Sequence, residues 1–466
     1  MRITITRLLL PLLLSVLCTA TADAQRKPTD ADALELRRIH DYAMTNGAAY
    51  DWLTYLTTRI GGRLSGTPQA AAAVEYTAQV MDTLGFDTVW RQPVLVPHWD
   101  RGAPEVVRVA QSLAGSFDLH ALALGGSVGT GPAGIAAEVV EVPNLEAIDS
   151  LGESVRGKIV FYNQPMDPTM LNSFAAYGGA VGQRVYGATR AAKYGAVGAL
   201  VRSMTTRQDD IPHTGSNVYL DDYPKTPAIA ISTNDADRLS DLLKAGPVTV
   251  YIRTTSQTLP DKLSHNVIGE IRGSERPDEI ILVGGHLDSW DVGTGAHDDG
   301  AGVVHAMDAL YVLRKLGWQP RRTVRVVAFM NEENGLRGAR EYARVSDARN
   351  EFHLAAIESD RGGFTPRGFT VEKTKAGNFD KQFKQLLRYR ELLEAYDLYF
   401  ELGGSGADIG PLREQNGLLI GFLPDSQRYF DYHHTPIDKF DAVSKRELQL
   451  GVAAIASLVY LIDKFQ

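Results

Sequence analysis

The amino-acid sequence predicts an α/β protein with a mostly parallel sheet flanked by helices and an inserted β-rich subdomain. Three observations lead to this fold class. Short apolar runs rich in β-branched residues alternate with stretches of helical periodicity in the first and last parts of the chain. Such alternation favours parallel strands joined by helices. Between these parts, glycine-rich turns separate short strands, and in the last part ionisable residues follow the strand ends.

Residues 1–24 are predicted to be a signal peptide. Two arginines precede an apolar run over residues 8–18, and small residues before Gln25 suit a cleavage site. The run is too short to span a bilayer comfortably. Leu17 precedes Cys18, whereas a lipoprotein needs a small residue there, so we expect a periplasmic or secreted protein without a lipid anchor. Cleavage would remove the only cysteine, leaving no disulfide.

The remaining elements fall into three blocks. The first part of the main domain is expected at residues 25–118, the inserted subdomain at 119–257 and the second part of the main domain at 258–466. The first block contains predicted helices at 31–44 and 67–84 and a strand at 88–96. The second contains strands at 135–140, 158–162 and 226–231 and a helix at 187–194. Helices at 301–315 and 445–464 belong to the third.

Four buried strands are predicted in the third block, and ionisable residues follow each of them. Open α/β sheets bind their ligands at the carboxyl ends of strands. Carboxylates scattered by chance would not gather at strand ends, so the pattern predicts one shared site. The strands and the residues beyond them are 279–283 with His286, Asp288 and Asp298; 323–330 with Glu332 and Glu333; 354–357 with Asp360; and 417–422 with Tyr432, His433 and His434.

The chemistry of this residue set favours a divalent metal ion. A single His-x-Asp is more often an ordinary turn, but histidine combined with several carboxylates suits a zinc-type ion. Because the mature chain would lack cysteine, any zinc ligands must be His, Asp or Glu. The formal net charge is −8 and no basic block interrupts it, which argues against nucleic acid and anionic membranes as partners.

The same segments resemble the motif set of the co-catalytic dizinc exopeptidases, the family of leucyl aminopeptidase and glutamate carboxypeptidase II. The likeness is closest to the carboxypeptidase Q branch and covers nearly the whole mature chain. In the inserted stretch, Gly157-Lys158-Ile159-Val160 and Lys193-Tyr194-Gly195-Ala196 resemble a protease-associated domain. The segments that carry the family likeness are His286-Leu287-Asp288, His297-Asp298-Asp299-Gly300-Ala301-Gly302, Asn331-Glu332-Glu333-Asn334-Gly335-Leu336-Arg337-Gly338, Glu358-Ser359-Asp360 and His434-Thr435.

The resemblance implies the zinc-peptidase fold and two Zn²⁺ ions per chain, bridged by Asp298. One ion would also bind His286 and Asp360. The other would also bind Glu333 and His434. Two cations about 3.5–4 Å apart can share one water and stabilise both the attacking and the leaving groups.

Two further carboxylates receive catalytic roles from the resemblance. Glu332 would be the general base that takes a proton from the zinc-bridged water. Asp288 would orient His286, because a ligand histidine needs its second ring nitrogen fixed by a nearby carboxylate. Asp299 is expected to cap the helix that follows, at a bend where the family often has a cis peptide.

Candidate substrate contacts are less specific. Relatives often have a tyrosine directly before the last histidine ligand, where this chain has His433 with Tyr432 one residue earlier. We favour His433 over Tyr432 as the oxyanion donor. The glycine-rich loop that carries Ser405 and Asp408 is either a wall of the substrate site or a tight connection.

The expected function is that of a secreted zinc-dependent exopeptidase acting on short peptides or dipeptides. The metal motif does not distinguish an aminopeptidase, a dipeptidase and a carboxypeptidase. A single-zinc acyltransferase of the glutaminyl cyclase kind and a non-catalytic receptor-like relative are the alternatives. The expected partner is a peptide substrate, with no nucleic acid and no membrane span, and a homodimer remains open.

Overall fold

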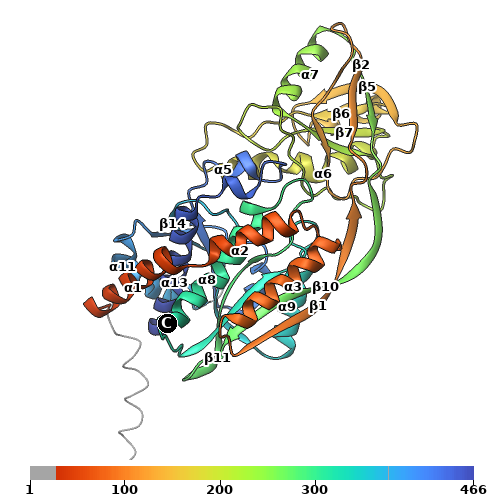
Figure 1. Ribbon diagram of the computed structural model, residues 1–466. Coiled ribbons are helices and arrows are strands. Elements are labelled where there is room, and N and C mark those ends of the chain that lie inside the picture. Colours follow the sequence, from red (N-terminus) through yellow and green to blue (C-terminus); the bar gives the residue numbers. More distant parts are fainter. Residues whose placement is uncertain (1–27, 376) are drawn as a thin grey trace, which may run out of the picture.

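A computed structural model describes residues 28–375 and 377–466 (Figure 1). The predicted signal peptide lies outside the described residues. The chain forms two eight-stranded sheets, one in a main domain and one in a smaller inserted domain. The inserted domain takes residues 106–253, and the main domain takes the residues on either side.

The main sheet has the strand order β1-β10-β12-β11-β13-β16-β14-β15. Its four central strands are parallel, and β10 on one side and β14 on the other pair antiparallel with them. The central strands are buried along most of their length, as expected for a parallel sheet covered on both faces. The strands are β1 (Thr88–Asp100), β10 (Gln257–Ile271), β11 (Arg276–His286), β12 (Arg322–Phe329), β13 (Phe352–Glu358), β14 (Pro366–Val371), β15 (Tyr399–Leu402) and β16 (Leu418–Pro424).

Helices cover both faces of this sheet. The larger apolar core joins one face to α1, α2, α3, α8 and α13, and a smaller core joins α9 to the other face. The predicted helices of the main domain are confirmed at α1, α3, α8 and α13. The main-domain helices are α1 (Asp30–Asn46), α2 (Ala49–Tyr55), α3 (Pro68–Thr83), α8 (Ala301–Lys315), α9 (Arg337–Ala348), α10 (Phe379–Leu386), α11 (Arg390–Glu394), α12 (Tyr429–Tyr432) and α13 (Lys445–Phe465).

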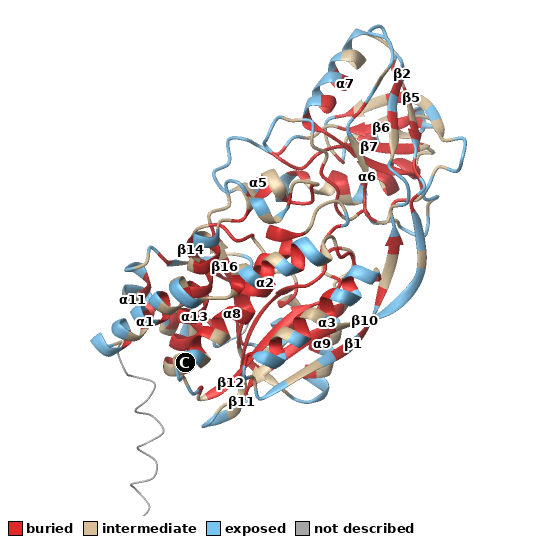
Figure 2. Ribbon diagram, viewed as in Figure 1, coloured by how far each residue is buried: buried red, intermediate tan, exposed pale blue. Residues whose placement is uncertain are grey.

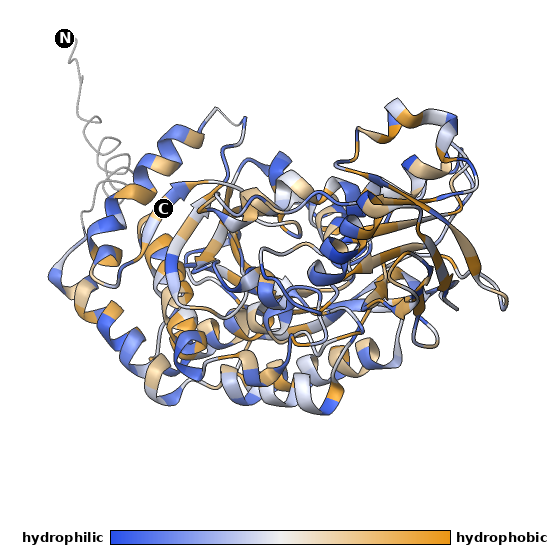
Figure 3. Cartoon of the chain, turned by 90° about the horizontal axis from the view of Figure 1, so that it is seen from above, coloured by the Kyte–Doolittle hydropathy of each residue, from blue (hydrophilic) through white to orange (hydrophobic). Residues whose placement is uncertain are grey.

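The colouring by burial and by hydropathy shows the same organisation. The strands and the inner faces of the helices are buried and apolar, and the outer helix faces are exposed and hydrophilic (Figures 2 and 3). Among the described residues, α13 alone is long and apolar enough to cross a membrane. Its apolar stretch is 89% buried within the protein, so α13 serves as a central helix of the core.

The inserted domain has the strand order β3-β2-β9-β5-β6-β7-β8-β4, with β5 to β8 parallel. The predicted strands are confirmed at β5, β6 and β8. The predicted helix at 187–194 is α6, which begins earlier, because glycines in its first part weaken the helical signal. The elements are β2 (Val106–Gln111), β3 (Phe117–Asp118), β4 (Ala121–Ala123), β5 (Ile135–Val142), α4 (Ile148–Leu151), β6 (Ile159–Tyr162), α5 (Ser173–Ala180), α6 (Gly182–Ala192), β7 (Gly198–Arg202), β8 (Ala228–Ile231), α7 (Thr233–Ala245) and β9 (Thr249–Arg253).

The inserted domain is joined to the main domain by a long antiparallel ribbon of β1 and β10 (Figure 1). Strands β2 and β3 lie in the inserted sheet, so residues 106–118 belong to the inserted domain and the predicted boundary at residue 119 is too late. The reason is that β2 pairs with β9 from the far end of the insertion, a long-range pairing that a local pattern does not reveal. At the other end, β10 begins at Gln257, beside the predicted boundary.

Buried histidines make the fold sensitive to acid. Burial lowers the pKa of His40 and that of His353 to about 4. His40 stacks on Tyr396 with ring centroids 3.7 Å apart, and its Nε2 has no hydrogen-bond partner among the described residues. Such a histidine binds a proton more readily in the unfolded chain. Its contribution to stability is therefore complete above pH 6.5 and is lost as the pH falls toward 4.

We predict that the free energy of unfolding falls between pH 6.5 and 4, and that His40→Phe makes this fall shallower by up to about 3 kcal/mol. Phenylalanine keeps the stacking on Tyr396 but cannot titrate. Urea unfolding at a series of pH values measures the slope, and unfolding at pH 8 shows how far the substitution itself changes stability. Equal slopes for the two proteins would contradict the prediction.

Candidate metal centre and its cavity

The five predicted metal ligands come together at the carboxyl edge of the main sheet. His286 ends β11, Glu333 follows β12, Asp360 follows β13, Asp298 precedes α8 and His434 follows α12. Because β11 pairs in parallel with both β12 and β13, the carboxyl ends of these strands share one edge. This shared edge explains why the strand-end pattern in the sequence predicted a single site.

Asp298 lies at the centre of the group, and its two carboxylate oxygens face different histidines. Oδ1 is 3.2 Å from Nε2 of His286, and Oδ2 is 3.2 Å from Nε2 of His434. Oδ1 of Asp360 lies 3.4 Å from the same nitrogen of His286. Oε2 of Glu333 lies 3.1 Å from the same nitrogen of His434. Each side therefore offers one imidazole and two carboxylates, with Asp298 shared between them.

This donor set fits divalent metal ions. Three groups of donors lie close enough together to bind one ion, namely Asp298, His433 and His434; His286, Asp299 and Asp360; and His286, Asp298 and Glu333. Oδ2 of Asp298 and Oδ1 of Asp360 are buried and have no hydrogen-bond partner among the described residues. Buried carboxylate oxygens are normally hydrogen-bonded or bound to a metal. Imidazole with carboxylate is a preferred combination for zinc.

Asp288 contributes differently from the prediction. Nδ1 of His286 donates to the backbone carbonyl of Asp288 at 3.0 Å, whereas the carboxylate is 3.9 Å away. The carboxylate instead accepts the N–H groups of Asn331 at 2.7 Å, Glu332 at 3.0 Å and Glu333 at 3.4 Å. Asp288 thus orients His286 through its main chain and holds the turn that carries the glutamate pair through its side chain.

Asp299 ties the start of α8 to the end of β11, as expected of a capping residue. Its carboxylate accepts the N–H of Gly302 at 2.9 Å and that of His286 at 3.0 Å. The peptide bond between Asp298 and Asp299 is cis. A side chain at Gly302 would collide with the carbonyl of Ser359, so glycine allows the helix to lie directly against the strand ends.

Two buried ionisable side chains that sequence reasoning missed hold the Asp298 loop. The carboxylate of Asp438 accepts the N–H groups of His297 at 2.8 Å and Asp298 at 3.1 Å. The guanidinium of Arg63 is fully buried and donates to the carbonyls of Leu287 at 2.5 Å, Thr294 at 2.7 Å and Gly295 at 3.0 Å. Asp438 is four residues after His434. It therefore joins the segment of one ligand to that of the shared ligand.

The protonation states show that the group attracts positive charge. Burial is the main reason that the pKa of Glu333 rises to about 7, with the charge of Asp298 adding to it. Burial opposes the charged form of His434, but Glu333 and Asp298 raise its pKa to about 9. Without a cation, the cluster would hold extra protons. Metal binding would therefore release protons and become weaker as the pH falls.

The ligands open into a cavity of about 710 Å³ between the two domains. Glu332 lines it, together with Asp298, Glu333, Asp360, His433 and His434. Aromatic side chains from both domains form much of the remaining wall, namely Trp99, Phe174, Tyr177, Tyr186, Tyr429 and Phe430. The inserted domain therefore contributes directly to the space in front of the metal ligands.

Of the predicted substrate contacts, only His433 lies in the described lining of this cavity. Tyr432 packs toward His297, with ring centroids 5.3 Å apart. Ser405 and Asp408 are buried outside the described cavity lining. Ser405 donates to Glu372 at 2.7 Å. Their glycine-rich loop therefore does not contribute to the described lining of this cavity.

Tyr429 and Arg184 line the cavity and were missed from the sequence. Tyr429 precedes His433 by four residues across the short helix α12, so both side chains face the same way. That spacing could have revealed it. Arg184 comes from α6 of the inserted domain, and its Nη1 lies 3.4 Å from Nδ1 of His434. No local motif marks it, because the contact joins residues 250 positions apart.

Comparisons with known proteins identify the family of the chain. Residues 266–459 match the model of peptidase family M28. The chain is 33% identical to carboxypeptidase Q of Bos taurus over 423 residues, which are 90% of this chain and 86% of the bovine protein. Carboxypeptidase Q of Homo sapiens is equally similar, at 33% over 424 residues, again 90% and 86% of the two chains.

The chain belongs to peptidase family M28. The crystal structure of a peptidase M28 precursor from Shewanella amazonensis SB2B is similar over 93% of this chain and 97% of that one, with 33% identity and a TM-score of 0.87. A zinc aminopeptidase from Bacillus subtilis shares the fold, with 21% identity and a TM-score of 0.64 over 88% of this chain and 94% of its own. The expected family, its closeness to carboxypeptidase Q and the fold class are confirmed.

For this M28 peptidase, we predict that Asp438→Asn lowers the free energy of unfolding of the metal-free protein by about 1–3 kcal/mol. The amide keeps one acceptor oxygen but faces the second buried N–H with its own donor. Urea unfolding measures the change. The matched control is Asp441→Asn, an exposed aspartate three residues later, which should be neutral. Equal effects of the two substitutions would contradict the role given to Asp438.

Proposed function

We propose that this M28 peptidase is an exported zinc-dependent exopeptidase that holds two zinc ions and cleaves short peptides or dipeptides. The observation that carries the proposal is the division of the two oxygens of Asp298 between two sets of donors. A filled donor set on each side supports two ions over a single-zinc acyltransferase. The complete set also supports an enzyme over a non-catalytic relative.

The ligand positions suggest which residues would hold the metals. His286 and Asp360 would bind one ion, Glu333 and His434 the other, and Asp298 both. Bound zinc would supply Lewis-acid polarisation of the scissile carbonyl and would make a bound water acidic.

The side chains of this chain supply the proton transfer and the oxyanion contacts. Burial raises the pKa of Glu332 well above its usual range, and neighbouring carboxylates raise it further against the opposing effect of His286. A carboxylate with a raised pKa can accept the proton of the attacking water and return it to the leaving amine. Tyr429 and His433 line the same space and can donate hydrogen bonds to an oxyanion.

The position of Arg184 supports a substrate with a free C-terminal carboxylate. Its side chain is buried and lines the cavity. A guanidinium is well suited to bind a carboxylate through paired hydrogen bonds. Because Arg184 contacts a metal-ligand histidine, little more than one residue fits between the reacting carbonyl and this charge. We therefore favour dipeptidase or carboxypeptidase action over that of a strict aminopeptidase.

We predict that Glu332→Gln keeps its zinc but lowers kcat on dipeptides by at least about 10²-fold, because the amide cannot accept a proton. Metal analysis and steady-state kinetics on the purified protein measure the two quantities together. The exposed Glu391→Gln, on α11, is the control for the substitution itself and should retain full activity. Near-normal kcat with bound zinc would remove Glu332 from the mechanism.

We also predict that Arg184→Gln raises KM for dipeptides with a free carboxyl end about 10-fold or more and leaves KM for the matching dipeptide amides unchanged. The lost charge matters only when the substrate carries a carboxylate, and a charge-assisted hydrogen bond contributes about 1.5–3 kcal/mol. N-blocked peptides with free C-termini provide a second check. Failure of the unmodified enzyme to cleave them would exclude a carboxypeptidase, and equally fast cleavage of dipeptides and dipeptide amides would then point to an aminopeptidase.

A further inference from the structure

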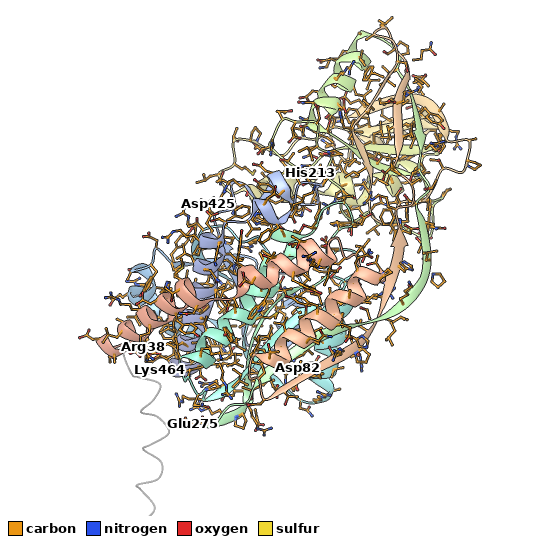
Figure 4. All side chains as sticks on the ribbon, in the orientation of Figure 1. Arg38, Asp82, His213, Glu275, Asp425 and Lys464 are labelled. Carbon is orange, nitrogen blue, oxygen red and sulfur yellow. The ribbon has the colours of Figure 1, made fainter. Side chains whose placement is uncertain are left out.

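One of the two metal-binding pairs is supported from outside the main domain. Residues 213–216 of the inserted domain, between β7 and β8, lie against His434 and Glu333. Figure 4 labels the first of these residues, His213, at the junction of the two domains. The segment is defined here as the docking segment. His213 and Thr214 within it are buried.

Thr214 fixes the orientation of His434. Its N–H donates to the backbone carbonyl of His434 at 3.0 Å, and its own carbonyl lies 3.3 Å from Nδ1 of the same histidine. The other group facing Nδ1 is Arg184, which can only donate. A histidine that presents the lone pair of Nε2 to a metal carries its proton on Nδ1, so this N–H points to the carbonyl of Thr214.

Ser216 holds the backbone of the other ligand of the pair, whose carboxylate accepts the N–H of Trp290 at 3.2 Å. Its hydroxyl donates a short hydrogen bond to the backbone carbonyl of Glu333. Between these two residues, Gly215 has a φ of +134°. A side chain there would collide with Arg184 and lie 2.7 Å from Nδ1 of His434. Only glycine lets the segment approach the histidine so closely.

The docking segment is anchored in the inserted domain. The hydroxyl of Thr214 donates to the carbonyl of Ala123 at 2.8 Å, and the N–H of Gly125 donates to the carbonyl of Gly215 at 2.9 Å. Its contacts with the ligands are therefore held by a folded structure and not by a free loop.

The other metal-binding pair has no such support among the described contacts. Nδ1 of His286 donates to the carbonyl of Asp288, which belongs to the main domain. We infer that the docking segment is a positioning element for the His434–Glu333 half of the centre, so that the inserted domain sets the metal affinity of this half and leaves the His286–Asp360 half unchanged. This inference rests on the proposed two-zinc function.

The test is a zinc titration of the metal-stripped mature protein in competition with a chromogenic chelator. For Ser216→Ala, we expect one of two zinc equivalents to bind about 10-fold or more weakly and the other to be unchanged, the size of effect typical for partners of metal ligands. Ser216→Thr keeps the hydroxyl and should restore the affinity. Gly215→Ala should weaken binding of the same zinc ion, because the added methyl group would push the segment away from His434.

The matched control is Ser173→Ala, which removes another serine hydroxyl between the domains. Ser173 donates to the carbonyl of Ser426 at 3.0 Å, and neither residue contacts a metal ligand in the described structure. It should bind zinc like the unmodified protein. The unfolding temperature of each metal-free variant shows that it is folded, a readout separate from metal affinity.

Two backgrounds identify the affected half. In the Asp360→Ala background, the zinc ion that still binds should bind more weakly when Ser216→Ala is added. In the Glu333→Ala background, adding Ser216→Ala should leave the affinity of the remaining zinc ion unchanged. Equal weakening of both equivalents, or the same result for Ser216→Ala and Ser173→Ala, would overturn the inference. Binding of fewer than two zinc ions by the unmodified protein would instead overturn the two-zinc proposal on which it rests.

Discussion

The shared carboxylate of Asp298 is the constraint on which the rest of the site depends. Its two oxygens must face two histidines that come from distant parts of the chain, so its backbone has little freedom. Three neighbouring side chains hold this backbone in place. Asp438 holds its N–H, Asp299 ties the following helix to β11, and Arg63 holds the preceding loop by its carbonyls.

The site also holds many buried carboxylates close together. Their own repulsion would disperse them without compensation. Arg63 supplies one permanent charge within the protein, but its three described side-chain hydrogen bonds go to carbonyls and not to carboxylates. The positive charge of Arg63 therefore stabilises the buried carboxylates by long-range electrostatic attraction. It leaves their oxygens free to bind metal ions. The remaining deficit of positive charge is what makes the centre selective for cations.

Much of the fold and of the ligand set could be predicted from the sequence, because both depend on local patterns. Apolar runs located β11, β12, β13 and β16, and parallel strands bring their ends together without further information. The exceptions depend on contacts between distant residues. The start of the inserted domain is set by the pairing of β2 with β9, and Arg184 approaches His434 only after the domains have packed together. The role of Asp288 differed from the prediction because its backbone carbonyl, and not its carboxylate, accepts the N–H of His286 Nδ1.

The ribbon of β1 and β10 has a consequence for how the protein is made. Residues 106–253 leave the ribosome before any of the five ligands, since the first of them is His286. β1 must wait for β10 to be synthesised before it gains its only neighbour in the main sheet. The inserted domain can thus fold as a unit while the main sheet is still incomplete. His434 is the last of the five proposed ligands to be synthesised, so a chain interrupted before it would lack a complete proposed metal centre.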